Sequence, residues 1–166
     1  MRGLGWIARG VVVLAAVAAV GCDRDTTPQQ LEKVAPTFVL NDGQRSVDIG
    51  KLKGKVVVLS FWATWCAPCI EEMPSLEALQ RQLPQVQIVL VASQESFTTY
   101  TGYLQRHPVS LLTVFDENQT SNALYGSFRF PETYVIDKGG VIRRKFIGPQ
   151  DWTSPAMVKY LAKLSS

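Results

Sequence analysis

The sequence predicts an α/β domain in which a mixed central β-sheet is flanked by helices on both faces. Apolar runs typical of strands alternate with amphipathic runs typical of helices, which favours strands joined by crossover helices. Residues 55–61 are almost continuously apolar, as expected for a central strand that is buried on both faces. Near the C-terminus two strand-like runs flank Lys138-Gly139-Gly140, a signal for a tight hairpin, so the sheet should also contain antiparallel strands.

The first elements of the domain should form a β-hairpin. The domain is expected to begin near Ala35-Pro36, and Asn41-Asp42-Gly43 is a turn signal between two short strand-like runs. The predicted strands of the whole domain cover residues 37–40, 46–48, 55–61, 86–92, 111–115, 133–137 and 141–147.

Four helices are predicted among and after these strands. The longest has apolar side chains at helical spacing, and Pro74 inside it is expected to bend it. Gly126 is expected to cap the end of the third helix, and Thr153 or Ser154 the start of the last, with Pro155 in its first turn. The predicted helices cover residues 67–83, 96–106, 118–125 and 153–164.

Residues 1–21 have the features of a signal peptide of the lipoprotein type. Two arginines precede an apolar stretch, residues 10–20, which has the length of a secretory signal. This region ends with Ala19-Val20-Gly21-Cys22, which resembles a bacterial lipobox, in which the cysteine is lipidated and becomes the first residue of the mature chain. Ala19 stands where such motifs usually have Leu, and an uncleaved N-terminal anchor is the alternative. Residues 22–34 would then be a polar tether to the lipid anchor, and residues 35–166 the folded domain.

The charge and cysteine counts agree with this division. The formal net charge of the chain is +3, and removal of residues 1–21 leaves 15 basic and 14 acidic residues. No basic stripe indicates nucleic-acid binding. The chain has three cysteines, which fits one lipidated Cys22 and one pair.

That pair, Cys66 and Cys69, carries the clearest chemical signal of the chain. The two cysteines are separated by two residues, follow an apolar strand and begin a predicted helix. A helix N-terminus stabilises a thiolate, and the thiolate is the form that attacks disulfides. The spacing therefore predicts thiol–disulfide exchange. The alternatives are a structural disulfide or half of a zinc site, which would need two more ligands in a chain whose only histidine is His107.

Three motifs give the sequence a family resemblance: FWATWCAPC (61–69), EEMP (71–74) and FPETYVID (130–137). From about residue 35 to the C-terminus the chain resembles the thioredoxin fold, and within it the TlpA/ResA/CcmG (DsbE) group of membrane-tethered extracytoplasmic thiol–disulfide oxidoreductases. The resemblance implies an extra central helical segment at residues 96–106. It also implies that Cys66 is the attacking cysteine and the more exposed of the two. Cys69 would be the resolving cysteine, closing a redox-active disulfide that needs no other cofactor and no metal.

The resemblance assigns further residues to the site. Pro131 matches a cis-proline that faces the active site, and Phe130 would lie at the edge where substrate chains dock; an ordinary trans-proline is the alternative. Glu72 matches a glutamate that accepts the Cys69 proton, unless it is simply a solvated helix residue. Ser60 occupies the position where thioredoxin has a buried acid, and this substitution strengthens the case for Glu72.

Three more residues are candidates for substrate contact or tuning. Trp65 matches the active-site tryptophan of the family and should shield the disulfide and join the docking surface. Pro68 lies between the cysteines and helps to set the reduction potential. Glu132 resembles an acidic residue of CcmG-like proteins that biases substrate choice, or it is a charge at the rim without a role.

The implied function is that of a reductase anchored to the extracytoplasmic, periplasmic face of a bacterial membrane, with Asp23 favouring the inner membrane. Its partners would be a membrane-embedded thiol electron donor and client proteins with oxidised cysteine pairs, such as apocytochrome c or copper-site assembly proteins. The chain is expected to be a monomer. The alternatives are an oxidant of protein thiols on the same fold and a non-catalytic copper or haem carrier. A peroxidase is disfavoured because Ala63 stands where peroxiredoxins need Thr or Ser.

Overall fold

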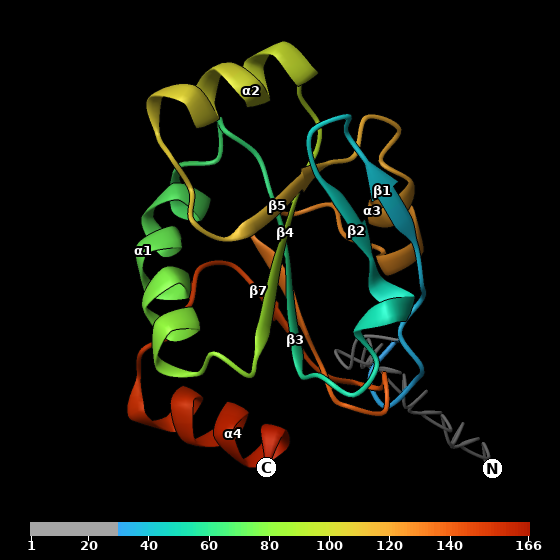
Figure 1. Ribbon diagram of the computed structural model, residues 1–166, viewed down its shortest axis with the longest axis vertical. Helices are drawn as coiled ribbons and strands as arrows, with labels where there is room; N and C mark the ends of the chain where they lie inside the picture. Colours follow the sequence, from blue (N-terminus) through green and yellow to red (C-terminus); the bar gives the residue numbers. More distant parts are fainter. Residues whose placement is uncertain (1–29) are drawn as a thin grey trace, which may run out of the picture.

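The computed structural model describes residues 30–166, which form one α/β unit (Figure 1). The predicted signal peptide, Cys22 and most of the predicted tether lie outside the described residues. Within residues 30–166 no helix is both long enough and apolar enough to span a bilayer.

The central sheet is mixed, as predicted, and has five strands in the order β5-β4-β3-β6-β7. The middle strand pairs in parallel with β4 and antiparallel with β6, and all six of its residues are buried. The strands are β3 (Val57–Trp62), β4 (Gln87–Ala92), β5 (Leu112–Phe115), β6 (Glu132–Ile136) and β7 (Ile142–Ile147).

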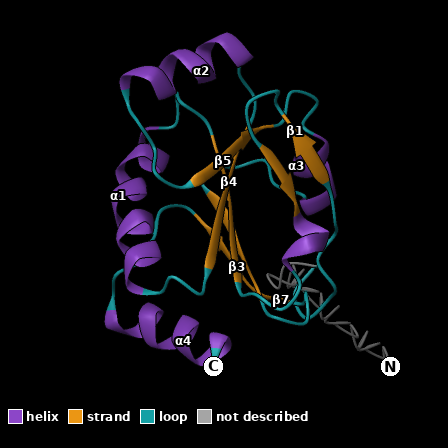
Figure 2. Ribbon diagram, in the orientation of Figure 1, coloured by secondary structure: helices purple, strands orange, loops and turns teal. Residues whose placement is uncertain are grey.

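Alternate residues of β3 contribute to two separate hydrophobic clusters, one on each face of the sheet. Val58 and Trp62 belong to the cluster beneath α1 and α4, whereas Leu59 and Phe61 belong to the cluster beneath the N-terminal hairpin and α3. Figure 2 shows these two covering layers on opposite sides of the sheet. The helices are α1 (Ala67–Gln82), α2 (Phe97–Arg106), α3 (Thr120–Tyr125) and α4 (Pro155–Ser165).

The predicted hairpin is present as a separate two-stranded sheet, β1 (Val39–Asn41) and β2 (Ser46–Asp48). It is followed by a 3-10 helix, η1 (Ile49–Leu52), that the sequence analysis did not predict. Pro74 lies within α1 and does not end it. Helix α3 begins two residues later than predicted, because Gln119 has a positive φ of 54° and the Asp116 carboxylate accepts the first helical N–H groups.

The directions of the strands give the sheet two functionally distinct ends. The carboxyl end of β3 leads to Cys66, and the antiparallel β6 begins at the same end, directly after Pro131. The pairing of Phe61 with Glu132 therefore brings the cysteine motif and the proline motif together. The opposite end of these strands carries Lys55 before β3 and Lys138 after β6.

Candidate active site

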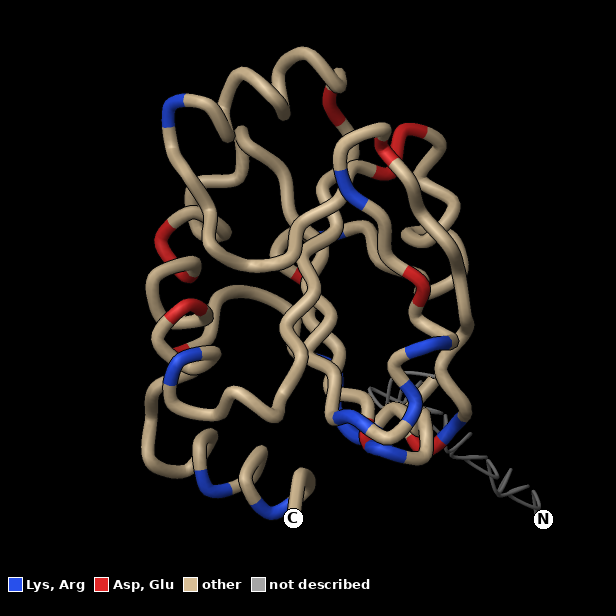
Figure 3. The backbone as a smooth tube through the Cα atoms, in the orientation of Figure 1, with Lys and Arg blue, Asp and Glu red and all other residues tan. Residues whose placement is uncertain are grey.

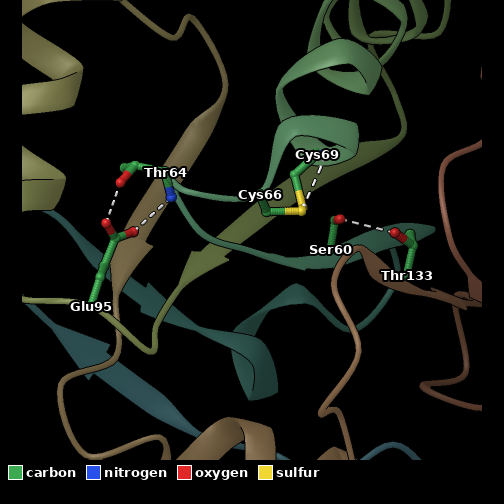
Figure 4. The surroundings of a disulfide bond; sticks show 6 residues. All are labelled: Ser60, Thr64, Cys66, Cys69, Glu95 and Thr133. Atoms are coloured by element: carbon green, nitrogen blue, oxygen red, sulfur yellow. Dashed lines mark hydrogen bonds between the residues drawn. A yellow bond between two sulfur atoms is a disulfide. The ribbon is translucent and has the colours of Figure 1, made fainter.

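Cys66 and Cys69 form a disulfide at the N-terminus of α1 (Figure 4). Cys66 is the N-cap residue of the helix, and its Sγ accepts a hydrogen bond from the Cys69 backbone N–H at 3.3 Å. The two residues are 4% and 3% exposed, so the expected difference in their exposure is absent. The physical reason is that both cysteines belong to the hydrophobic cluster beneath α1.

The proline motif lies at the same end of the sheet. The Phe130–Pro131 peptide bond is cis, as the sequence predicts. Pro131 is buried, and its carbonyl accepts the Gly148 N–H at 2.8 Å, which ties the loop to the end of β7. Phe130 is half-buried and packs against both hydrophobic clusters.

Trp65 and Phe130 join the two motifs through their side chains. Their rings stack with centroids 6.0 Å apart and an interplanar angle of 27°. Trp65 remains 59% exposed, and its indole N–H donates to the Gln94 carbonyl at 3.2 Å. Two other apolar residues near this end of the sheet are exposed: Phe128, in the same loop as Phe130, and Ile147, which pairs with Glu132. The stacked pair of Trp65 and Phe130 gives the cysteine motif an aromatic neighbour.

A second contact holds the loop that precedes Cys66. The Glu95 carboxylate accepts a hydrogen bond from the Thr64 backbone N–H at 2.9 Å and another from the Thr64 hydroxyl (Figure 4). Glu95 follows Gln94, whose φ of 63° is left-handed. The loop after β4 therefore binds both Thr64 and Trp65 through hydrogen bonds. Glu95 was not among the residues predicted for the site, because its partner is 31 residues away and no local pattern in the sequence indicates the contact.

Glu72 lies one helical turn after Cys69 and is only 4% exposed, so it is not a solvated helix residue. The Trp152 indole N–H donates to Glu72 Oε1, whereas Oε2 has no hydrogen-bond partner within residues 30–166. Burial raises the pKa of this carboxyl from its ordinary value of 4.5 to about 7, although the Trp152 hydrogen bond acts to lower it. A carboxyl with this pKa can take or give a proton near neutral pH. Trp152 was missed by the sequence analysis because it lies 80 residues away.

Glu132 is not a charge at the rim, because it is 3% exposed. Its Oε1 accepts the backbone N–H groups of Phe128 and Arg129 at 3.2 and 2.9 Å, and its Oε2 lies 2.7 Å from Lys145 Nζ. The carboxylate thus faces the loop that leads to Pro131. Its geometry suits a residue that positions this loop.

The remaining predicted residues have simpler settings. Pro68 is in the first turn of α1. Ser60 is buried and accepts a hydrogen bond from the Thr133 hydroxyl at 2.9 Å, in the surroundings of the disulfide (Figure 4). His107 caps the end of α2, where its ring packs on Tyr103. Over the described part of the chain there is no group of three or more His, Cys, Asp or Glu residues that could hold a metal ion.

Comparison with known proteins agrees with this geometry. The family model named Redoxin matches residues 30–162. The chain belongs to the Redoxin family.

Relatives narrow the assignment within the Redoxin family. The chain is 30% identical to the thiol-disulfide oxidoreductase ResA of Bacillus thuringiensis (strain Al Hakam). The alignment is 166 positions long and covers 95% of each chain. It is also 30% identical to the thioredoxin-like protein YneN of Bacillus subtilis (strain 168), over 86% of this chain and 89% of that one. A crystal structure of a candidate thiol:disulfide interchange protein DsbE from Chlorobium tepidum superposes with a TM-score of 0.68. That pair is 27% identical, covering 79% of this chain and 92% of the other.

This Redoxin-family chain is therefore a TlpA/ResA/CcmG-like thiol–disulfide oxidoreductase, and the predicted thioredoxin-like fold is confirmed. Its fold brings Cys66, Cys69, Trp65, Phe130 and Pro131 to one end of the sheet. Such an arrangement can exchange two electrons with a cysteine pair of another protein.

Proposed function

We propose that this oxidoreductase is a membrane-tethered reductase of client disulfides. The observation that carries the proposal is the combination of a cysteine pair at the start of α1 with a buried carboxyl, Glu72, one helical turn further along. The first cysteine of the pair sits at the positive end of the helix dipole, which favours its thiolate. The carboxyl offers a place for the proton of the second cysteine.

The reaction uses these groups in two steps. In the reduced chain the Cys66 thiolate attacks one sulfur of a client disulfide; a mixed disulfide forms and one client thiolate leaves. Glu72 then takes the proton of Cys69, and the Cys69 thiolate attacks Cys66 Sγ. This releases the second client thiolate and closes the Cys66–Cys69 disulfide. Two electrons pass to the client, and a thiol donor must return two electrons to the chain.

The surface around the disulfide suits protein clients. Trp65 and Phe130 form a stacked aromatic pair next to the cysteine motif, with Trp65 exposed, and an extended client segment would dock at Phe130, before Pro131. Pro68 tunes the potential from inside the disulfide ring. Glu132 influences client choice through the loop that it holds rather than by direct contact.

The proposal includes the place of action. Residues 1–21 would direct export, and lipidated Cys22 would hold the domain at the extracytoplasmic face of the inner membrane. There it would receive electrons from a membrane-embedded thiol donor. It would pass them to oxidised cysteine pairs, such as those of apocytochrome c or of copper-site assembly proteins, and would act as a monomer with its disulfide as the sole redox group.

The decisive experiment is the reduction potential of the Cys66–Cys69 couple in the full chain. The chain would be equilibrated with glutathione or dithiothreitol buffers, and its free thiols would be counted by alkylation. A potential near or below about −200 mV, toward that of thioredoxin, supports a reductase. A potential near about −120 mV would make the chain an oxidant of protein thiols, and the absence of a reversible couple would favour a metal or haem carrier.

A further inference from the structure

Four exposed lysines gather at the end of the sheet that lies opposite the disulfide. They are called the lysine end here: Lys33, Lys53, Lys55 and Lys138. The Gly54 N–H donates to the Lys138 carbonyl at 2.9 Å, so the turn before β3 touches the turn after β6. Ala35, two residues after Lys33, donates to the Gly140 carbonyl at 2.8 Å. Figure 3 shows basic residues concentrated at this end and acidic residues toward the other.

The acidic residues near the lysine end do not cancel its charge. Glu32 and Asp137 both pair with Arg143, and Asp48 pairs with Lys51. Within residues 30–166, no aspartate or glutamate forms an ion pair with any of the four lysines of the lysine end. Lys138 Nζ donates a hydrogen bond to the backbone oxygen of Ser166. The positive charges of Lys33, Lys53 and Lys55 are therefore available to an external anionic surface.

Apolar groups lie among these lysines. Val34 is 69% exposed. It lines a pocket together with Ile49 and Leu52, and Lys53 and Lys55 line the same pocket. Lysines around an exposed apolar side chain, here Val34, suit the boundary between lipid headgroups and acyl chains, where both kinds of group are satisfied. A nucleic-acid backbone would interact only with the lysine charges and would leave the apolar groups without a partner, so a membrane fits this end better.

We propose that the lysine end docks on an anionic membrane surface. The inference rests on the membrane tether of the proposed function. The described part of the chain begins near this end, where Val34 forms an isolated β-bridge with Val141. Docking would set the sheet upright on the bilayer. The six residues of β3 then raise the disulfide by about 20 Å above the lysines. The disulfide would face away from the membrane, toward clients.

The expected strength of this docking follows from the charge. Each lysine near an anionic lipid surface contributes about fivefold to partitioning, and the attraction fades within about 10 Å at 0.1 M salt. The three available lysines are enough to orient a domain that a tether already holds near the bilayer. The docking should therefore depend on anionic lipid and be reversed by salt.

The test is hydrogen–deuterium exchange on the full chain bound to lipid vesicles. Exchange of residues 50–56 and 137–141 would be compared between pure phosphatidylcholine vesicles and vesicles in which a third of the lipid is phosphatidylglycerol. We expect exchange several-fold slower with phosphatidylglycerol, with the protection lost at high salt. Equal exchange in the two lipids would overturn the proposal.

A matched pair of variants separates this surface from general charge. Lys53→Gln with Lys55→Gln should weaken the docking about 25-fold, at about fivefold for each lysine, and should reduce the protection accordingly. Arg106→Gln with Arg129→Gln, which removes two exposed charges elsewhere, should preserve the protection. Equal loss in both double variants would contradict a specific lysine end. Two further measurements test the proposed function by itself. Flotation of the chain with phosphatidylcholine vesicles tests the tether, and reduction of a protein disulfide tests the redox activity. If both succeed while the protection is absent, the docking proposal fails and the proposed function stands.

Discussion

At the scale of single residues, the buried Glu72 carboxyl determines how the reaction should depend on pH. Its pKa of about 7 means that half of the molecules hold the proton near neutral pH. We expect Glu72→Gln to slow the closing of the Cys66–Cys69 disulfide by about 10²-fold or more, since a general base contributes on that order. The variant should also lose the inflection near pH 7 in its rate profile. Stopped-flow Trp fluorescence of mixed-disulfide resolution would measure both effects.

The matched control is Glu71→Gln, which changes the neighbouring exposed glutamate of the same helix. It should leave the rate and the inflection unchanged. An unchanged pH profile in Glu72→Gln would show that another group takes the Cys69 proton.

The same residue links stability to pH. Because folding raises the pKa of Glu72 from 4.5 to about 7, the folded chain holds this proton more tightly than the unfolded chain. Its contribution to stability is therefore lost as the pH rises from about 4.5 to 7, and the total loss is roughly 3 kcal/mol. The free energy of unfolding in urea would be measured at pH 4 and pH 8. Its change between these pH values should differ by this amount between the wild type and Glu72→Gln. Parallel pH dependences would contradict the raised pKa.

Glu95 makes a smaller, structural contribution at this scale. It accepts two hydrogen bonds from Thr64, and a carboxylate acceptor is worth more than a neutral one. Glu95→Gln should lower the free energy of unfolding by about 1–2 kcal/mol and loosen the loop that carries Trp65. Reduction of a protein client should then slow more than reduction of a small disulfide. Equal slowing of both substrates would mean that the contact does not position Trp65.

At the scale of elements, the sequence predicted most strands and helices because each has a local signal. The apolar run before Phe61 gave β3, and the helical spacing after Cys69 gave α1. The sequence did not predict η1, and the predicted start of α3 is too early. Both differences arise because a 3-10 turn and the left-handed Gln119 depend on contacts rather than on hydrophobic periodicity. Trp152 and Glu95 were missed for the same reason, since their partners are far away in sequence.

The junction of β6, β7 and the loop before Pro131 depends on the Glu132–Lys145 ion pair. The side chains are 3% and 11% exposed, and removal of one partner of such a buried pair costs about 3–5 kcal/mol. Glu132→Gln should therefore destabilise the chain strongly and raise hydrogen exchange at Phe128 and Arg129. The double variant Glu132→Gln with Lys145→Met should recover much of the lost stability. Failure of the second change to restore stability would indicate that the loop contacts of Glu132 matter more than its charge.

At the scale of the whole molecule, the two ends of the sheet have different chemistry. The strand directions place both redox motifs at one end and the lysine end at the other. The family resemblance already implied that Pro131 faces the cysteines, and the antiparallel pairing of β3 with β6 is the structural cause, because it brings both motifs to the same end of the sheet. This separation would let the disulfide end exchange electrons with clients while the lysine end remains bound to the membrane.

The direction of electron flow should also be visible in the stability of the whole fold. A disulfide couple is reducing when folding stabilises its oxidised form, and the oxidant DsbA is the reverse case, because its reduced form is the more stable. If the chain is a reductase, its oxidised form should unfold at a higher urea concentration than its reduced form. Each 1.4 kcal/mol of difference corresponds to about 30 mV between the folded and unfolded couples. A chain with Cys66→Ala and Cys69→Ala should show no response to dithiothreitol, which controls for Cys22. A reduced form that is more stable than the oxidised form would instead establish the chain as an oxidant of protein thiols.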